Sequence, residues 1–385
     1  MDAVTMHSAT DLMQRIMALA PVVAQHRAEF EALRRMPQPV IEAMVAADLF
    51  RLWTPRRFGG AEVSPRDFVD LIEAASAMDG SFGWCLTNAN TMGRMVAYLP
   101  ESAARNWVSQ PDCQMAGSTA SLGQARRAEG GFVVSGRWPF ASGISSARRI
   151  IGLCKVEGEG DPQHPVLILC HFDAGAVKIL DTWQVSGLKG TGSHDFIATD
   201  VFVSDDHAHG LVDAVPSHSG ALYRFPIVSM LTFSVAIVPL GIAKSAIQAF
   251  MDLADRTRAG TTQPLKDRET IQADLARAEA MRRSGRALML SALDDLEQAL
   301  AIGGQPLIEA RAFFRVALAH SAECCVRAVE LVTTAAGAAA IMDSSPLERC
   351  SRDIQAAVKH IAMAPHNFAL GGKIMLGVDT GSARF

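Results

Sequence analysis

The chain has 385 residues, 49% of them hydrophobic, and a formal net charge of −4 at pH 7. This length allows a large core and two or three domains, and the slightly acidic balance argues against a nucleic-acid-binding protein. The seven cysteines are odd in number and form no C-x-x-C pair, so they predict neither a disulfide framework nor a metal site. We expect a cytoplasmic protein without a signal peptide.

The first third of the chain has the apolar periodicity of helices. Leu12, Ile16, Leu19 and Val23 recur at the spacing of one helix face. A loop at residues 55–60 interrupts the pattern, and Pro65 follows at a position that suits the first turn of a new helix. These features predict an N-terminal α-helical domain over residues 1–110.

The pattern then changes twice along the chain. Residues 111–216 contain short β-rich runs separated by turns, and these predict a middle β domain. Residues 217–385 return to long Ala-rich helical stretches, which predict a C-terminal helical bundle. The most apolar run, residues 225–242, contains Pro226 and Pro239 and three polar breaks, so it predicts a buried helix rather than a membrane span. The expected class is therefore α+β, mostly α.

Three segments carry distinctive motifs. Residues 136–143 (GRWPFASG) end a predicted strand with an aromatic, a proline turn and a hydroxyl. Residues 187–195 (GLKGTGSHD) form a glycine-rich loop that leads into a strand, whereas a dinucleotide-binding fingerprint leads into a helix. Residues 346–353 contain Pro-Leu-Glu-Arg followed by Arg-Asp.

In this order, the three segments resemble those of the acyl-CoA dehydrogenase superfamily. Their sequences are most similar to its reduced-flavin-dependent monooxygenase branch. The resemblance covers essentially the whole chain. It implies the acyl-CoA dehydrogenase-like fold: an N-terminal helical domain, a middle β-barrel-like domain and a C-terminal four-helix bundle.

The resemblance implies a flavin site between the β domain and the C-terminal bundle. In it Trp138 packs on the ring edge, the Ser142 hydroxyl bonds to flavin N5 or to the C4a oxygen adduct, and Gly117 and Ser118 face the pyrimidine side. Gly190 belongs to the glycine-rich turn near the flavin. The alternatives are that Trp138 is ordinary sheet core and that Ser142 and Ser118 are turn residues.

Further cofactor contacts are implied at the C-terminal end. Arg352 and Asp353 match the family's Arg-Asp helix start, and Arg256 resembles an arginine that reaches a flavin phosphate, commonly of a neighbouring subunit. Arg258 competes with Arg256 for that assignment, and either could be a solvated arginine at a helix end. Only Gly337 remains where dehydrogenases carry two glycines, which favours FMN over FAD as the reduced flavin.

The placement of carboxylates separates two activities of this superfamily. A dehydrogenase of acyl thioesters needs a glutamate base, but one of its usual places reads His360-Ile361-Ala362, and no glutamate lies between Glu159 and Glu269. The resemblance implies that His360 is close to substrate and flavin, with His366 as a weaker candidate. The alternative for His360 is a solvated histidine on a helix surface.

Substrate contacts are expected on the helix that follows Gly83-Trp84. Aromatic hydroxylases of this branch often carry a second histidine there, whereas this chain has none. The residues that could hydrogen-bond or contact a substrate in this helix are Asn88, Asn90, Thr91 and Met92.

The resemblance thus implies a two-component monooxygenase. Such an enzyme receives reduced flavin from a separate flavin reductase, uses O2 to form a C4a-(hydro)peroxyflavin, and oxygenates a small hydrophobic substrate of aromatic, heteroaromatic, amine or sulfur type. The sequence contains no NAD(P)H motif, which fits this arrangement. The family also implies a homotetramer, and we expect no metal, nucleic-acid or membrane partner. The alternatives are an FAD-dependent acyl-CoA dehydrogenase or oxidase and a non-catalytic flavin-binding scaffold.

Overall fold

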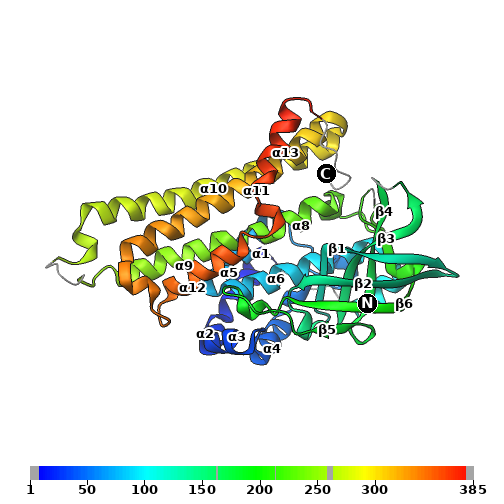
Figure 1. Ribbon diagram of the computed structural model, residues 1–385, viewed down its shortest axis with the longest axis horizontal. Helices are drawn as coiled ribbons and strands as arrows, with labels where there is room; N and C mark the ends of the chain where they lie inside the picture. Colours follow the sequence, from blue (N-terminus) through cyan, green and yellow to red (C-terminus); the bar gives the residue numbers. More distant parts are fainter. Residues whose placement is uncertain (1–7, 162–163, 213, 258–262, 379–385) are drawn as a thin grey trace.

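The chain forms helices, then a sheet, then helices again (Figure 1). The computed structural model describes residues 8–161, 164–212, 214–257 and 263–378. The helices before the sheet are α1 (Ala9–Ala18), α2 (Ala20–Gln25), α3 (Arg27–Leu33), α4 (Gln38–Ala46), α5 (Pro65–Met78), α6 (Gly80–Gly93) and α7 (Glu101–Trp107). The strands are β1 (Met115–Ala128), β2 (Gly131–Ala141), β3 (Arg149–Gly160), β4 (Pro165–Asp173), β5 (Lys178–Leu180), β6 (His194–Ser204) and β7 (Ala208–Gly210). The helices after the sheet are α8 (Ile227–Ala236), α9 (Val238–Leu253), α10 (Glu269–Ile302), α11 (Gly304–Ala336), α12 (Pro346–Ala357) and α13 (His366–Met375).

The expected α+β, mostly α class is confirmed by this order of elements. The change from helix to strand lies between α7 and β1, and the change back lies between β7 and α8. The division into domains at residues 110 and 216 stays a prediction.

The strands form one seven-stranded sheet in the order β5-β6-β2-β1-β3-β4-β7. Only β1 and β3 pair in parallel among these neighbours. The described strands therefore form an open sheet with β5 and β7 as its edge strands. They do not close into the ring of strands that a barrel requires. Alternating apolar residues give the sheet a hydrophobic core of its own, built around Trp138, Phe172 and Phe196.

Helix α6 lies between the sheet and the C-terminal helices (Figure 1). Almost every residue of α6 is buried, because its sequence has no charged side chain and can be surrounded by protein on all sides. Gly83 permits close contact with α5, since a Cβ atom there would lie 2.0 Å from the Oγ of Ser76. This helix therefore brings its side chains to the junction between the sheet and the bundle.

The long helices α10 and α11 pack against each other and against α9, and α12 packs on both α9 and α11. They extend away from the sheet as an arm (Figure 1). Two stretches, Ile227–Leu253 and Gly304–Ile341, are long and apolar enough to cross a membrane by length and composition alone. The most apolar window of the first is 78% buried inside the fold, which agrees with the expected core helix, whereas that of the second is 39% buried. Helix α11 therefore carries apolar surface that the other described residues do not cover.

Candidate functional site

Trp84 joins the two residues that the sequence marks as catalytic candidates. Its indole Nε1 donates a hydrogen bond of 2.9 Å to the Oγ of Ser142. Its ring packs edge-on against His360, with 5.8 Å between ring centroids. Three elements thus meet here: α6, the end of β2 and the start of the 3-10 helix η11 (Ile361–Met363).

Helix α6 holds Trp84 in place from its first turn. The Oδ1 of Asp79 accepts hydrogen bonds from the backbone N–H groups of Ser81 and Phe82, at 2.9 and 3.1 Å, and so caps the helix. Trp84 was not among the predicted site residues. The sequence did carry a signal for it, namely a tryptophan within a helix that has no charged residue. Such a tryptophan is expected to be buried, and a buried indole N–H usually needs a hydrogen-bond acceptor.

Ser142 belongs to a run of buried hydroxyl groups. Its Oγ lies 2.8 Å from the Oγ of Ser193, which lies 2.7 Å from the Oγ1 of Thr191. Thr191 donates in turn to the carbonyl oxygen of Leu188 at 2.8 Å. All three hydroxyl-bearing residues are buried. The glycine-rich loop therefore reaches Ser142 through Ser193 and Thr191, two residues that the sequence analysis did not select.

Gly190 has a packing role in the fold. A Cβ atom at this position would lie 2.5 Å from the ring of Phe30 in α3. Gly190 therefore lets the N-terminal helices pack closely on the loop, and its place near the flavin stays a prediction.

His360 is held as a neutral imidazole. Its Nδ1 accepts a hydrogen bond of 3.2 Å from the backbone N–H of Ala362 and caps η11. Burial lowers the pKa of His360 to about 4. The neutral ring therefore carries its proton on Nε2, which leaves an N–H donor for a neighbouring group. His366, the weaker candidate, is exposed at the start of α13.

The prediction for Trp138 was wrong, because its ring is enclosed by the core of the sheet. The indole Nε1 donates to the carbonyl oxygen of Leu153 at 2.7 Å, and the ring stacks on Phe196 with 4.8 Å between centroids. Trp138 is fully buried. The alternative stated from sequence, an ordinary core residue, is the one that the structure supports.

Phe140 is the aromatic residue that faces outward next to Ser142. It is 62% exposed, and its φ of +64° lies in the left-handed region that few side-chain-bearing residues adopt. Its ring meets Trp183 edge-on, with 6.4 Å between centroids. A strained backbone that presents a large exposed aromatic is a feature expected at a binding surface.

Gly117 and Met92 are in contact at the junction of β1 and α6. A Cβ atom at Gly117 would lie 2.6 Å from the carbonyl oxygen of Ile151 and 2.9 Å from the Sδ of Met92. Ser118 is buried, and its Oγ accepts a hydrogen bond from the backbone N–H of Ala120 at 3.2 Å. The last contact is the turn interaction that was the alternative for Ser118.

Two of the predicted substrate residues on α6 are used by the fold. Asn90 accepts from the backbone N–H of Leu52 at 2.7 Å and donates to two backbone carbonyls, so its amide is occupied by the protein. Thr91 is buried and donates to the carbonyl oxygen of Thr87 at 2.7 Å. Both predictions are therefore corrected. Asn88 is half-buried, and its Nδ2 donates to the carbonyl oxygen of Trp84.

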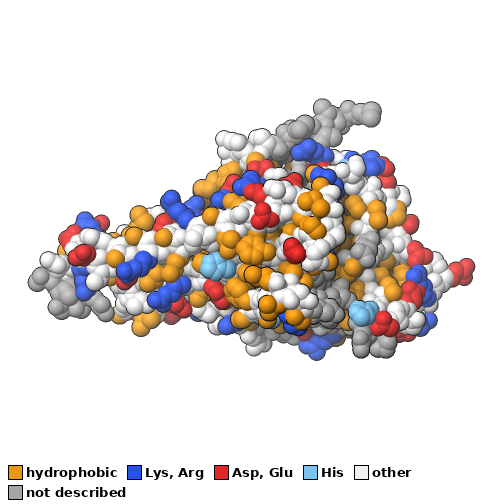
Figure 2. All heavy atoms as spheres, turned by 90° about the horizontal axis from the view of Figure 1, so that it is seen from above, with side chains coloured by type: hydrophobic (Ala, Val, Ile, Leu, Met, Phe, Trp, Pro, Cys, Tyr) orange, Lys and Arg blue, Asp and Glu red, His pale blue; other side chains and the backbone are white. Residues whose placement is uncertain are grey.

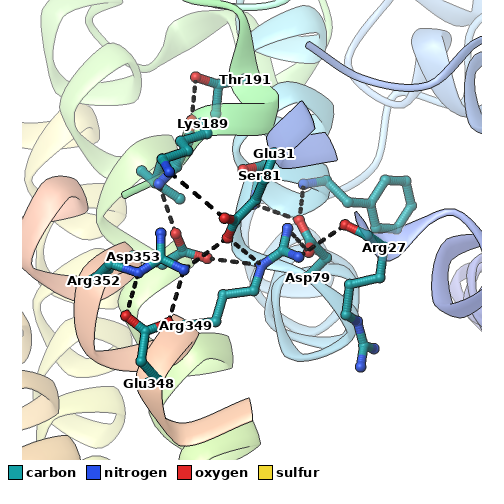
Figure 3. A network of polar contacts seen from close by, with 12 residues as sticks. Arg27, Glu31, Asp79, Ser81, Lys189, Thr191, Glu348, Arg349, Arg352 and Asp353 are labelled. Atoms are coloured by element: carbon teal, nitrogen blue, oxygen red, sulfur yellow. Dashed lines mark hydrogen bonds and ion pairs between the residues drawn. The ribbon is translucent and has the colours of Figure 1, made fainter. Parts of the chain in front are cut away.

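Arg352 and Asp353 anchor the glycine-rich loop (Figure 3). Arg352 forms ion pairs with Glu348 and Glu31 and donates to the carbonyl oxygen of Ser186 at 2.6 Å. Asp353 accepts from the backbone N–H of Leu188 at 2.6 Å. These contacts occupy both side chains, so the predicted direct role in cofactor binding is corrected to one of positioning the loop.

A buried ion pair completes this network (Figure 3). The guanidinium of Arg349 lies 2.6 Å from the Oδ2 of Asp79 and 3.7 Å from the Oδ2 of Asp353. Burial, with Asp79 as a second cause, raises the pKa of Asp353 to about 7. The network joins α12, the cap of α6 and the loop that carries Thr191 and Ser193.

Arg256 is exposed, three residues beyond the end of α9. Its predicted contact with a flavin phosphate stays a prediction. Arg258 lies outside the described residues.

The exposed Phe140 and the half-exposed Trp183 offer aromatic area, and Ser142 offers a buried hydroxyl. No carboxylate hydrogen-bonds to Trp84, Ser142 or His360 in the part of the chain that the structure describes. Among the described residues, this arrangement supplies aromatic area, a hydroxyl group and N–H donors, but no carboxylate base.

Comparisons with known proteins agree with this geometry. Residues 13–108 match the family model described as the N-terminal domain of acyl-CoA dehydrogenase, and residues 233–365 match that of its C-terminal domain. The chain is 30% identical to an indole-3-acetate monooxygenase of Pseudomonas putida, over 91% of this chain and 89% of that protein. It is 29% identical to the oxygenase component of an FADH2-dependent resorcinol hydroxylase of a Rhizobium species, over 96% and 94% of the two chains.

A solved structure has the same fold. XiaF from a Streptomyces species, determined in complex with FADH2 and glycerol, superimposes with a TM-score of 0.86. The match covers 96% of each chain at 24% sequence identity. The expected fold is thereby confirmed.

Proposed function

The chain belongs to the acyl-CoA dehydrogenase superfamily and is a flavin-dependent monooxygenase within it. From this premise we propose that it oxygenates a small aromatic or heteroaromatic molecule. Its named relatives act on indole-3-acetate and on resorcinol. The observation that carries the proposal is the convergence of Ser142 and His360 on one indole ring, that of Trp84.

The cofactor in this proposal is reduced flavin. When bound, reduced flavin would supply the two electrons with which O2 transfers one oxygen atom to the substrate and releases the other as water. Phe140 and Trp183 would pack against the ring system, and the Ser142 hydroxyl would hydrogen-bond at N5, whereas Gly117 lets β1 pack closely on β3 and on Met92. The buried side chains of α6 would exclude water from the reacting atoms.

His360 would act on the substrate or on bound oxygen as a donor. With a pKa of about 4 it is neutral at pH 7, and its Nε2–H is free of the backbone contact made by Nδ1. A neutral donor orients an oxygen atom or a ring nitrogen without adding a charge to a buried site.

The rival activity, dehydrogenation of an acyl thioester, needs a carboxylate to remove an unactivated proton. The described contacts of Trp84, Ser142 and His360 include no carboxylate. The monooxygenase relatives also favour oxygenation over dehydrogenation.

The partners of the enzyme follow from the same proposal. The relatives named as oxygenase components belong to systems with a second protein, so we infer that a separate reductase supplies reduced flavin. FMN is the preferred flavin in this proposal and FAD the alternative.

We also propose a homotetramer in the cytoplasm. Exposed hydrophobic side chains lie on α11 (Phe313), after it (Ile341), at the end of α13 (Met375) and just beyond it (Leu376). Figure 2 shows hydrophobic side chains along the helical arm. A second subunit would cover this surface.

The test is isotopic. The protein is incubated with a flavin reductase, NADH, FMN or FAD, ¹⁸O2 and a panel of indoles and phenols. A product that contains one ¹⁸O atom supports the proposal. Consumption of NADH with hydrogen peroxide as the only product, for every compound and both flavins, would count against it.

A further inference from the structure

Four hydrogen bonds in series connect Trp84 to the backbone of the glycine-rich loop. They run from the indole Nε1 of Trp84 to Ser142 (2.9 Å), from Ser142 to Ser193 (2.8 Å), from Ser193 to Thr191 (2.7 Å) and from Thr191 to the carbonyl oxygen of Leu188 (2.8 Å). We call this series the hydroxyl chain.

The chemistry of the two ends gives the hydroxyl chain one direction. An indole N–H can only donate, and a carbonyl oxygen can only accept. Each hydroxyl group between them has a single proton. All four bonds can therefore form at once in only one way, with Ser142 donating to Ser193, Ser193 to Thr191, and Thr191 to Leu188.

Both ends are firmly held. Trp84 is buried in α6. The Leu188 peptide has its N–H bonded to the Oδ1 of Asp353 at 2.6 Å, and its carbonyl oxygen also accepts from the Nε1 of Trp183 at 3.2 Å. Because buried polar groups left without partners are costly, reversing one hydroxyl would leave a bond unmade elsewhere in the chain.

The direction of the hydroxyl chain determines what the Ser142 hydroxyl can offer to a ligand. Its only proton points to Ser193, and one of its lone pairs accepts from Trp84. The remaining lone pair is therefore what Ser142 offers to a ligand. Ser142 in this state is a hydrogen-bond acceptor.

We propose that Ser193 and Thr191 are positioning residues that hold Ser142 as an acceptor, and that this makes the site prefer reduced flavin over oxidised flavin. The inference rests on the proposed function, in which Ser142 meets flavin N5. Reduced flavin carries an N–H at N5 and can donate to Ser142, whereas oxidised flavin presents a lone pair there, and two acceptors facing each other repel.

The test is an anaerobic equilibrium titration of the full-length protein with reduced and with oxidised FMN. The quantity compared is the ratio of the two dissociation constants. Thr191→Val removes the third hydroxyl at nearly constant volume, and Thr191→Ser retains it. Ser193→Ala breaks the chain at a second point, and Ser135→Ala removes a hydroxyl that bonds to Asp200 on the outer part of β2.

Wild type, Thr191→Ser and Ser135→Ala should share one ratio that favours reduced flavin. In Thr191→Val and Ser193→Ala the hydroxyl of Ser142 is free to turn and donate, so the ratio should fall by about fivefold, mainly through tighter binding of oxidised flavin. An unchanged ratio in both chain-breaking variants, or an equal fall in Ser135→Ala, would overturn the inference while leaving the proposed function intact. Failure of the wild type to bind either flavin would overturn both.

Discussion

Trp84 donates its indole proton to Ser142 across 2.9 Å, and this bond joins the central helix α6 to the end of strand β2. His360 packs on the edge of the same ring. The indole therefore sets the relative positions of two groups that lie far apart in the sequence.

Removing the Trp84 N–H should uncouple the reaction. Trp84→Phe keeps an aromatic ring but leaves the lone pair of Ser142 without its donor, which should cost about 1 to 2 kcal/mol of unfolding free energy. The product formed per NADH consumed should fall, and hydrogen peroxide should rise. Trp53→Phe is the matched control, because Trp53 is equally buried and its Nε1 has no hydrogen-bond partner among the described residues. Equal coupling in the two variants would contradict the role given to Trp84.

His360→Ala should lower product formation by about tenfold to a hundredfold while flavin affinity is retained, because a hydrogen-bond donor to the reacting groups is lost. His360→Asn should recover part of the activity, since its amide can both cap η11 and donate. Steady-state turnover and flavin titration measure the two effects. His366→Ala serves as the control, and full turnover by His360→Ala would show that the ring has no catalytic role.

Phe140→Ala should weaken flavin binding by about two- to tenfold, as expected for the loss of one aromatic contact. Its stability should stay within about 0.5 kcal/mol of wild type, because the side chain is mostly exposed. Trp138→Ala should behave in the opposite way and cost about 3 to 5 kcal/mol, since that ring fills the core of the sheet. Thermal unfolding and flavin titration of both variants separate these outcomes, and unchanged flavin affinity in Phe140→Ala would remove it from the site.

Arg349→Met should destabilise the protein by about 3 to 5 kcal/mol. Asp79 is buried and pairs with Arg349, so the variant leaves a buried carboxylate without its partner. Arg66→Met is the control: its ion pair with Asp294 is exposed, and it should change stability by less than about 1 kcal/mol. Urea unfolding of both variants tests this, and similar losses would argue against the anchoring network.

Acid should destabilise the fold through three histidines, of which His171 is buried and His209 and His360 are half-buried. Burial lowers the pKa of His209 to about 4, as it does for His360, and lowers the pKa of His171 well below its ordinary value of 6.5. Below pH 6.5 these histidines become protonated in the unfolded chain, whereas they stay neutral in the folded protein. The stability they allow is therefore complete above pH 6.5 and is lost as the pH falls towards 4, by up to about 1.4 kcal/mol per pH unit for each ring.

Urea unfolding between pH 7.5 and 5 measures that slope. His209→Gln should reduce it, and substitution of the exposed His164 should not. A slope that stays the same in His209→Gln would contradict the account of acid sensitivity.

The sequence predicted the succession of helices, strands and helices because apolar periodicity and turn residues are local signals. It also selected Ser142 and His360, both of which contact Trp84 in the structure. It failed where a side chain's direction depends on packing. Trp138 and Phe140 are two residues apart on one strand, and the bulge between Trp138 and Ala141 decides which of them faces outward.

The same limit explains the corrected polar residues. Arg352, Asp353 and Asn90 were selected for their chemistry, but their partners come from segments far away in the sequence, such as Glu31, Leu188 and Leu52. The hydroxyl chain could not be predicted for the same reason. To predict it, one would have to know that the end of β2 and the loop before β6 lie close together in the fold.

Above all, we expect this protein to control the reaction of reduced flavin with oxygen. The most direct measurement mixes the protein, loaded anaerobically with reduced FMN and separately with reduced FAD, with oxygenated buffer, and follows the absorbance of oxidised flavin. The account predicts that oxidised flavin appears markedly more slowly than from free reduced flavin, and that an aromatic substrate changes this time course. Reoxidation at the rate of free flavin, with either flavin and with every substrate tried, would contradict it.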